Sequence, residues 1–433
     1  MNRYNSYKDS GEEWIGEIPI TWEVGKLGFF SSVYRGSGYQ FLQQVDEDSS
    51  ETKEKVVRIG DFNDFKPIWC KYLEQFENYR IKKGNLLIGG TGHYFGKNMF
   101  VSDEMEGLIH SYNIIRLVVN NQDSKYVSYW LQSNLIREQM DISVLGSGQP
   151  FIDLQGVKDL KLLIPPLPEQ QQIVSFLDDK TQKIDSLIQH KEKKIELLKE
   201  KRTSLINHVV TKGLDSNVEM KDSGVEWIGE IPNHWGIPKL SYLLEGITDG
   251  THGTHERVDE GELFLSSKNV TNKGLSIGKN ESQITTEEHE KIVKKGYPVK
   301  GDILITVVGS IGRSCVYEYD YPISFQRSVC FLRLRKTVNE YFMNFLINSD
   351  VIQFQLLKNT KKSTQGGIYM NDLKRFDTIL PPISEQQQIV EYLDKHTEEI
   401  DTLIQLEQKK IDILKEYRQS LISEVVTGKL RVV

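Results

Sequence analysis

The feature that most constrains this chain is an internal repeat with a period of about half its length. Residues 8–19, which contain KDSG and WIGEIP, return 213 positions later at 221–232. A second pair, PPLPEQQQIV at 165–174 and PPISEQQQIV at 381–390, is separated by 216 positions. This period is too long for a solenoid repeat, so each unit is expected to be a domain plus an appendage.

The middle parts of the two repeats differ, although their ends are almost unchanged. Only weak similarity survives between 83–88 and 300–305, and a Gly-rich turn follows each of these segments. A duplicated framework with two dissimilar inserts favours one scaffold that holds two different recognition modules. Ordinary drift of two structural domains is the alternative.

Each repeat ends in a long segment with the apolar pattern of a coiled coil. Residues 169–210 contain no Pro or Gly, and their apolar positions recur three, four or seven residues apart. This spacing is close to the 3.5-residue period, and it returns 216 positions later. Prolines before each stripe and Gly213 and Gly428 after it predict where the helices begin and end. The stripes contain Ile173, Leu177, Ile184, Ile188, Ile195, Leu198 and Leu205, and then Ile389, Leu393, Ile400, Ile404, Ile411, Leu414 and Leu421.

Two matching stripes in one chain are expected to pair with each other. Each helix would span roughly 60 Å at ~1.5 Å per residue. An antiparallel coiled coil would hold the two globular units at opposite ends, related by a pseudo-two-fold axis. The spacing alone also permits parallel pairing between two chains, as in a plain dimerisation coiled coil.

The composition indicates more than one domain and a reducing compartment. The 433 residues exceed the ~250–300 at which single cores stop growing. Cys70, Cys315 and Cys330 have no CxxC spacing, so neither a disulfide framework nor a zinc site is expected. The sequence has no signal-peptide pattern and no run of ~18 apolar residues, which predicts a soluble cytoplasmic protein.

The net charge of −7 is unfavourable for DNA binding, because phosphates attract Lys and Arg. The charge is unevenly distributed, however. Basic residues outnumber acidic ones over 300–377, and the reverse holds over 385–424. Net charge therefore neither establishes nor excludes a DNA-binding role.

The order of these blocks resembles the specificity subunit of Type I restriction–modification systems over nearly the full length. A globular unit, PPLPEQQQIVSFLD at 165–178, a second globular unit and PPISEQQQIVEYLD at 381–394 follow one another as in that family. GEIPITW at 16–22 and GEIPNHW at 229–235 are similar to the start of each target-recognition domain there. The combination occurs twice at matched spacing, which makes the resemblance specific.

The resemblance implies an α+β fold with target-recognition domains at 1–163 and 215–379 and spacer helices at 164–214 and 380–433. Each domain would recognise one half of a bipartite site on double-stranded DNA, and the helices would set the gap. The implied partners are two methyltransferase (M) subunits and the restriction (R) motor–nuclease subunits. S-adenosylmethionine and ATP with Mg are then expected on those partners, and no cofactor on this chain.

Two pairs of matched loops contain the main candidates for DNA contact. The first pair follows strand-like runs, and Arg in such a loop can reach guanine or a phosphate. A tight structural turn is the alternative interpretation. The candidates in this pair are Thr91, His93, Tyr94 and Lys97 in the first half, and Ser310 and Arg313 in the second.

The second pair of loops precedes the proline-rich blocks. It contains Gln149 in the first half and Lys361, Lys362 and Gln365 in the second. Gln can pair with adenine and Lys can neutralise phosphate, although a solvated surface loop fits the same residues. Weaker candidates are Arg35, Tyr39, His252 and Arg327, the last in an expected strand where it faces either DNA or a nearby acid.

Signatures of catalysis or metal binding are incomplete. Residues 92–98 have three positions between glycines where a phosphate-binding loop requires four. Neither Pro-Pro pair follows the Asn or Asp of an adenine methyltransferase motif, and His252 and His255 lack a third metal ligand. We therefore expect a non-catalytic DNA-recognition subunit without a metal site. The alternative is a coiled-coil scaffold or dimerisation protein without DNA specificity.

Overall fold

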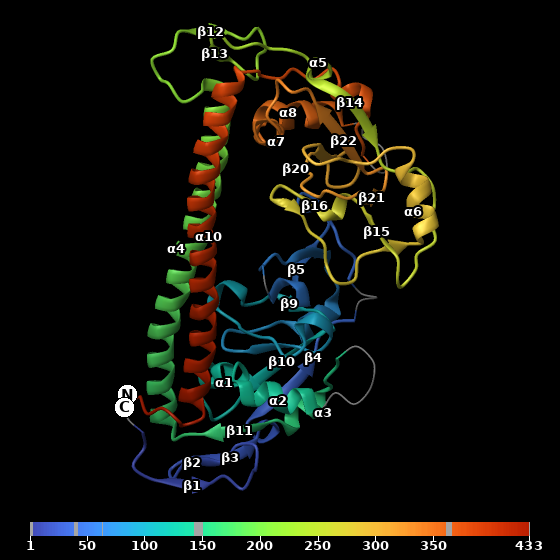
Figure 1. Cartoon of the computed structure of the whole chain (residues 1–433). Helices are drawn as coiled ribbons and strands as arrows, with labels where there is room; N and C mark the ends of the chain where they lie inside the picture. Colours follow the sequence, from blue (N-terminus) through green and yellow to red (C-terminus); the bar gives the residue numbers. More distant parts are fainter. Residues whose placement is uncertain (1–2, 39–41, 63, 143–149, 361–365, 433) are drawn as a thin grey trace. The chain divides into compact units, whose positions relative to one another are not determined.

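The chain forms two compact units, each of which contains part of both long helices (Figure 1). The first unit contains residues 1–192 and 408–433, and the second contains residues 193–407. Each unit therefore combines one globular part with about one half of each helix. The computed structural model describes residues 3–38, 42–62, 64–142, 150–360 and 366–432.

The globular part of the first unit is built on an antiparallel four-stranded sheet in the order β4-β10-β7-β8. A three-stranded sheet has the order β6-β5-β9, and its β5–β9 pair is parallel. Two smaller sheets pair β1 with β2 and β3 with β11. The strands are β1 (Tyr7–Asp9), β2 (Glu17–Pro19), β3 (Glu23–Lys26), β4 (Ser31–Arg35), β5 (Lys53–Val57), β6 (Ile68–Lys71), β7 (Leu86–Gly89), β8 (Asn98–Phe100), β9 (Ile109–His110), β10 (Ile114–Val119) and β11 (Lys161–Ile164). The α-helices of this part are α1 (Ser124–Leu131), α2 (Asn134–Ile142) and α3 (Leu154–Asp159).

The globular part of the second unit has the same plan. Its four-stranded sheet has the order β14-β22-β19-β20, and its three-stranded sheet has the order β18-β15-β21 with a parallel β15–β21 pair. The strands are β12 (Met220–Asp222), β13 (Glu230–Pro232), β14 (Leu244–Asp249), β15 (Glu262–Leu265), β16 (Val270–Thr271), β17 (Gly274–Leu275), β18 (Gln283–Ile284), β19 (Ile303–Thr306), β20 (Ser314–Val316), β21 (Ser324–Phe325) and β22 (Val329–Leu334). The helices are α5 (Leu240–Leu243), α6 (Thr286–Val293), α7 (Glu340–Ile347), α8 (Asp350–Asn359) and α9 (Met370–Leu373).

Matching local signals produce this matching topology. The inner strands β7 and β19 are buried along their whole length, as expected for strands covered on both faces. Asp123 caps α1 and Asn339 caps α7, because each side chain accepts hydrogen bonds from the second and third backbone N–H groups that follow it. The sequence repeat is therefore also a repeat of the fold.

The repeated segment at the start of each half buries a tryptophan. Trp22 and Trp235 are almost fully buried. The indole Nε1 of Trp235 donates to Glu385 at 3.0 Å, whereas the Trp22 ring packs edge-on against Tyr4 with centroids 5.8 Å apart. The same core position thus has a polar partner in the second unit and an aromatic partner in the first.

The two long helices, α4 (Leu167–Lys212) and α10 (Ile383–Val426), pair antiparallel as a coiled coil. In the first unit, Asp185 in the first half of α4 pairs with Arg418 in the second half of α10 at 2.9 Å. In the second unit, Arg202 near the end of α4 pairs with Asp401 in the first half of α10 at 3.1 Å. Both contacts require opposite helix directions within one chain, so the pairing is not the parallel arrangement between two chains.

The side chains of the predicted apolar stripes are shielded from solvent along both helices. Most of their side chains are buried, and the rest are half-buried. Each helix is followed by a glycine with positive φ, 75° at Gly213 and 72° at Gly428, and a left-handed residue is the usual end of a helix. The buried members are Ile173, Leu177, Ile184, Ile188, Ile195, Ile389, Leu393, Ile400, Ile411 and Leu421, and the half-buried members are Leu198, Leu205, Ile404 and Leu414.

Two further properties concern the whole described chain. Within the described ranges, none of the helices has the length and apolar character needed to cross a membrane. Cys70, Cys315 and Cys330 are buried free thiols, and burial raises the pKa of each. A raised thiol pKa keeps the reactive thiolate scarce, so these cysteines behave as core residues.

Candidate nucleic-acid interface

In each unit, loops that are far apart in the sequence meet at one end of the four-stranded sheet. In the first unit, Ser37 forms a parallel bridge with Ser111, and Thr91 forms an antiparallel bridge with Phe151. We call the residues Arg35, Thr91, Tyr112 and Phe151 the first loop edge. It joins the end of β4, the loop after β7, the turn before β10 and the segment before α3.

The second unit repeats this convergence. Thr251 bridges to Gln326 in parallel, and Val308 bridges to Gly367 in antiparallel orientation. We call the residues Asp249, Thr251, His252, Val308 and Arg327 the second loop edge. In each unit, one bridge thus joins the candidate loop after the inner strand to the segment beside the candidate loop that precedes the proline-rich block.

In both edges, glycine is required where the chain after the outer strand passes closest to the neighbouring turn. A Cβ atom at Gly36 would clash with the backbone carbonyl oxygens of His110 and Ser111. A Cβ atom at Gly250 would clash with those of Phe325 and Gln326. The residue before each of these glycines, Arg35 or Asp249, is therefore held next to the neighbouring turn by backbone contacts that admit no side chain.

The first loop edge places an arginine against two exposed aromatic rings. The Cζ atom of Arg35 lies 5.0 Å from the ring centroid of Tyr112 and 5.4 Å from that of Phe151. These rings are 46% and 48% exposed. Among the described residues, no carboxylate pairs with Arg35, and its buried Nη1 has no hydrogen-bond partner. The fold therefore orients this guanidinium mainly by stacking.

Further cation–ring contacts lie on the same unit. Lys97 Nζ is 5.1 Å from the centroid of Tyr94, and the His93 ring packs edge-on against Tyr94. Gly92–Tyr94 form a short 3-10 helix, so part of this loop has regular structure. Thr91 precedes this helix and is half-buried.

Behind the first loop edge lies a buried histidine. His110 Nδ1 is 2.6 Å from the carbonyl oxygen of Tyr79. Burial lowers the pKa of His110 to about 4, and the nearby Arg116 guanidinium acts in the same direction. Arg116 itself lies over the Tyr34 ring at 4.7 Å and donates to the Arg80 carbonyl. At neutral pH this layer has a neutral imidazole and a fixed arginine.

The second loop edge has different chemistry. His252, which is exposed, contacts the Asp249 carboxylate through Nε2 at 2.7 Å. Arg327 was expected in a strand, and this is wrong, because it lies in the turn between β21 and β22. Its backbone N–H donates to the Thr251 carbonyl at 3.0 Å, and its side chain is exposed. Ser310 and Arg313 are exposed in the loop that follows β19.

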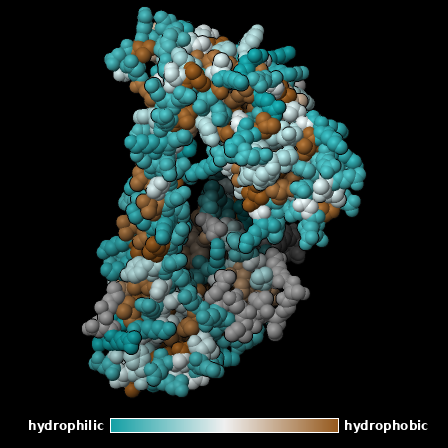
Figure 2. Space-filling view, viewed as in Figure 1, coloured by the Kyte–Doolittle hydropathy of each residue, from teal (hydrophilic) through white to brown (hydrophobic). Residues whose placement is uncertain are grey.

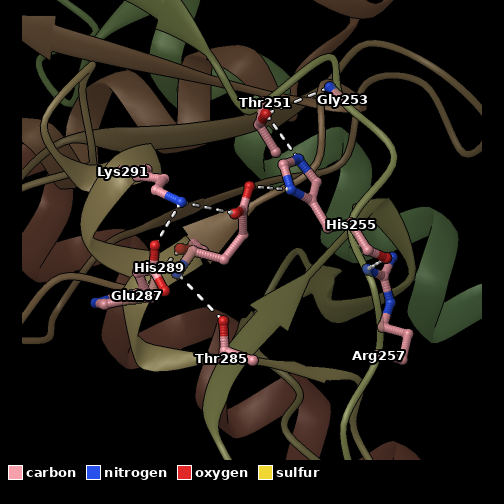
Figure 3. A network of polar contacts seen from close by, with 10 residues as sticks. Thr251, Gly253, His255, Arg257, Thr285, Glu287, His289 and Lys291 are labelled. Carbon is pink, nitrogen blue, oxygen red and sulfur yellow. Dashed lines mark hydrogen bonds and ion pairs between the residues drawn. The ribbon is translucent and has the colours of Figure 1, made fainter.

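A polar network supports the second loop edge from inside (Figure 3). His255, with a side chain only 7% exposed, contacts Thr251 Oγ1 through Nε2 at 2.9 Å and Glu288 Oε1 through Nδ1 at 2.8 Å. Glu288 belongs to α6, so the network ties the loop after β14 to a helix. Arg257 Nη1 adds a hydrogen bond to the His255 carbonyl at 2.7 Å.

These contacts also bear on the possibility of a metal. Both ring nitrogens of His255 are engaged by Thr251 and Glu288, and His252 pairs with Asp249. Over the part of the chain that the structure describes, no group of three His, Cys, Asp or Glu side chains is placed to hold a metal ion. His252 and His255 are thus each engaged by neighbouring side chains.

Not all of the remaining candidates fall within the residues that the structure describes. Tyr39, Gln149, Lys361, Lys362 and Gln365 lie outside the described residues. Sequence reasoning missed Tyr112, Phe151 and the contact between His255 and Glu288. For Tyr112 and Phe151 a weak signal exists, since each is an aromatic residue next to a short strand or a Gly-rich loop. Direct DNA contact by any of these residues remains a prediction.

Comparisons with known proteins agree with this architecture. The family model for the Type I restriction modification DNA specificity domain matches residues 19–197 and 258–415. The putative type I restriction enzyme MjaX specificity subunit of Methanocaldococcus jannaschii is 25% identical over 453 residues, covering 96% of each chain. The type I restriction enzyme MjaVIII specificity subunit of the same organism is 26% identical, covering 96% of this chain and 94% of that protein.

A solved structure supports the fold. It comes from a study of complex assembly and conformational transition of the type I R-M system, and it matches with a TM-score of 0.70 at 18% sequence identity. The match covers 95% of this chain and 99% of that chain. The family model covers most of the present chain and falls on both repeats. The chain therefore belongs to the Type I restriction modification DNA specificity family, and its role is recognition of DNA sequence rather than catalysis.

Proposed function

We propose that the chain recognises a bipartite site on double-stranded DNA and directs partner subunits to it. In this proposal, residues 1–163 and 215–379 are the recognition domains, and each recognises one half of the site. The segments 164–214 and 380–433 form the spacer that sets the gap. The observation that carries the proposal is the pair of loop edges, which have the same backbone plan and different side chains.

The chemistry of the two edges supports recognition of two unlike half-sites. The first edge offers a stacked guanidinium and exposed rings, whereas the second offers a carboxylate–imidazole pair and the Arg327 cation. Direct readout depends on donors and acceptors at base edges in the major groove. Two edges with different donor and acceptor sets would therefore select different bases.

Cations near the edges can offset the unfavourable net charge. Arg35, Lys97, Arg313 and Arg327 lie on or beside the loop edges, and Arg35, Arg313 and Arg327 enter no ion pair with a described residue. A cation without an acidic partner is free to neutralise a phosphate, which releases condensed counterions. Local positive charge of this kind supports binding to DNA by a chain whose overall charge is −7.

The surface of the two long helices is consistent with the binding of two copies of one partner protein. Apolar side chains are interspersed with hydrophilic ones along α4 and α10 (Figure 2). Leu187 and Ile413 are exposed in the first unit, and their repeat equivalents Leu403 and Leu197 are exposed in the second. Exposed apolar positions that occur twice suit the binding of two identical proteins. We infer that these are the methyltransferase subunits.

The chemistry of modification and cleavage would then belong to the partners. S-adenosylmethionine would bind to the methyltransferase subunits, and ATP with Mg to the restriction motor–nuclease subunits. Methylation of an adenine inside a duplex requires the base to leave the stack, and a fixed register on DNA would present that base to the methyltransferase. In this proposal, the present chain fixes the position of the complex along the DNA.

The test is DNA binding and methylation by the chain assembled with a cognate methyltransferase subunit. Binding is measured at fixed salt, and methylated adenines are mapped across a genome that expresses both proteins. We expect one bipartite motif with a constant gap. Salt-sensitive binding without a preferred motif, together with no methylation, would contradict the proposal and favour a coiled-coil scaffold.

A further inference from the structure

We propose that Arg35 is a specificity-determining residue that recognises a guanine in the half-site bound by the first unit, an inference that rests on the proposed function. The ligand chemistry is a pair of adjacent hydrogen-bond acceptors, which the O6 and N7 atoms of guanine present in the major groove. The guanidinium fork matches such a pair with two parallel hydrogen bonds.

The first line of support is the position of Arg35 in the fold. It is the last residue of β4, an outer strand of the four-stranded sheet, and it pairs across the sheet with Ile115 of β10. Gly36 follows directly and leaves no room for a Cβ atom, so the backbone at this point lies against the neighbouring turn. Backbone held in this way keeps a recognition side chain in a reproducible place.

The second line of support is the way in which the side chain is held. Tyr112 and Phe151 both lie near the guanidinium and both expose almost half of their surface. A described carboxylate that would satisfy the guanidinium internally is absent, in contrast to Arg80, which pairs with Glu54 and Glu77. A cation that the fold orients without neutralising is prepared for an external acceptor.

A phosphate could supply the same acceptor chemistry as guanine. Phosphate contacts fix register without reading sequence, whereas base contacts carry sequence information. The guanidinium of Arg35 lies 5.0 and 5.4 Å from two rings that belong to different loops, and a guanidinium held between such contacts suits a planar base edge. We therefore assign the guanine edge, and the experiment separates the two acceptors.

The second unit provides an internal contrast. The equivalent residue is Asp249, which precedes Gly250, the glycine that likewise leaves no room for a Cβ atom. Its carboxylate only accepts hydrogen bonds and is engaged by His252. A carboxylate cannot donate to O6 and N7 of guanine. The proposal therefore predicts a guanine that depends on Arg35 in one half-site, and no counterpart that depends on Asp249 in the other.

The test replaces Arg35 in the complex of the full chain with its methyltransferase subunit. Arg35→Met removes the hydrogen bonds and keeps a long side chain against the rings, and Arg35→Ala is the second variant. His252→Ala on the other edge is the matched control. Methylated adenines are mapped for each complex, and affinity is measured against duplexes that carry each base in turn at every position of the motif.

The expected result is that one G·C position in one half-site becomes degenerate in both Arg35 variants. Affinity for the original site should fall about 5- to 150-fold, the range for loss of one bidentate base contact. The other half-site should keep its sequence. His252→Ala should leave the Arg35-dependent position unchanged.

Three results would overturn the inference alone. These are a wild-type motif without G·C in the first half-site, Arg35 variants with an unchanged motif and affinity, or weaker binding to all sequences with a salt slope reduced by about one. The last result would identify a phosphate contact. If the wild-type complex has no bipartite motif at all, the proposed function fails, and the inference fails with it.

Discussion

The two loop edges occupy the same place on the same sheet topology, yet their polar side chains are held by different means. The first edge holds Arg35 by stacking on Tyr112 and Phe151. The second edge holds its loop by a hydrogen-bonded chain through Thr251, His255 and Glu288. The framework of sheets and helices is the same in both halves, while the side chains at the two loop edges differ. A duplicated scaffold can thus present two unrelated surfaces without a change of fold.

The same contrast extends to the layers under the edges. His110 in the first unit corresponds to Phe325 in the second, and each is buried next to the parallel bridge of its edge. Trp22 and Trp235 also correspond, but only the second donates a hydrogen bond to a described acceptor. These matched pairs allow each interaction to be tested against its own equivalent in one protein.

The largest expected effect concerns the two buried tryptophans. Trp22→Ala and Trp235→Ala should each destabilise their own unit by about 3–5 kcal/mol, because a large cavity forms in a packed core. Hydrogen exchange of the peptides that contain α1 and α7, measured by mass spectrometry on the full chain, reports on the two units separately. Faster exchange in both units from either substitution would contradict separate cores.

The corresponding phenylalanine variants sharpen the comparison. Trp235→Phe removes the donor to Glu385, so it should cost about 1–2 kcal/mol more than Trp22→Phe, which removes no hydrogen bond to a described residue. The same exchange measurement applies. Equal costs in the two units would show that the Trp235–Glu385 hydrogen bond contributes little.

The second effect is a pH dependence confined to the first unit. Burial lowers the pKa of His110 from 6.5 to about 4, so between these values the unfolded chain binds more protons than the folded chain. The contribution of His110 is therefore complete above pH 6.5 and is lost as the pH falls towards 4, by about 3 kcal/mol in total. Urea unfolding of the wild type at pH 7 and pH 5 measures the loss.

The matched variant is His110→Phe, which copies the residue at the equivalent position of the second unit. Carboxylates also titrate in this range, so the informative quantity is the difference between wild type and variant at each pH. As the pH falls from 7 to 5, the free energy of unfolding of the wild type should decrease more than that of the variant. A difference that is independent of pH would mean that His110 is not held neutral.

The third effect is smaller and lies in the second loop edge. Glu288→Ala breaks the hydrogen bond to His255 and should destabilise the loop that contains Thr251 by about 1–2 kcal/mol. Glu287→Ala is the control, because Glu287 is highly exposed and pairs only with Lys291 among the described residues. Hydrogen exchange of residues 249–257 should increase for Glu288→Ala alone. A similar increase for both variants would indicate general weakening of α6.

The smallest effect concerns the matched ion pairs between the long helices. Arg418→Ala and Arg202→Ala each remove a partly exposed pair, and such pairs are worth about 0.2–1 kcal/mol. We expect similar small losses in thermal stability, which should shrink at high salt because exposed charges are screened. A loss above about 2 kcal/mol in one unit only would show that the two halves of the coiled coil are unequal.

Much of the architecture could be predicted from the sequence, because its signals are local and repeated. The stripe from Ile173 to Leu205 predicts a helix through its spacing alone, and Gly213 marks its end through backbone geometry. The nearly identical segments at 8–19 and 221–232 identify two copies of one unit. These features require no knowledge of contacts between distant residues.

The loop edges could not be predicted in the same way. Arg35, Tyr112 and Phe151 are far apart in the sequence, and their meeting depends on the strand order β4-β10-β7 and on the bridge between Thr91 and Phe151. Arg327 was expected in a strand, whereas a turn intervenes between β21 and β22. The His255–Glu288 contact joins a loop to a helix and leaves no periodic signal.

The central claim is that each globular part recognises its own half of the DNA site. The most direct measurement exchanges residues 215–379 for the corresponding segment of another specificity subunit and maps methylated adenines made by the assembled complex. The account predicts that one half of the motif changes to that of the donor protein, while the other half and the gap stay the same. A change in both halves would contradict independent recognition by the two parts.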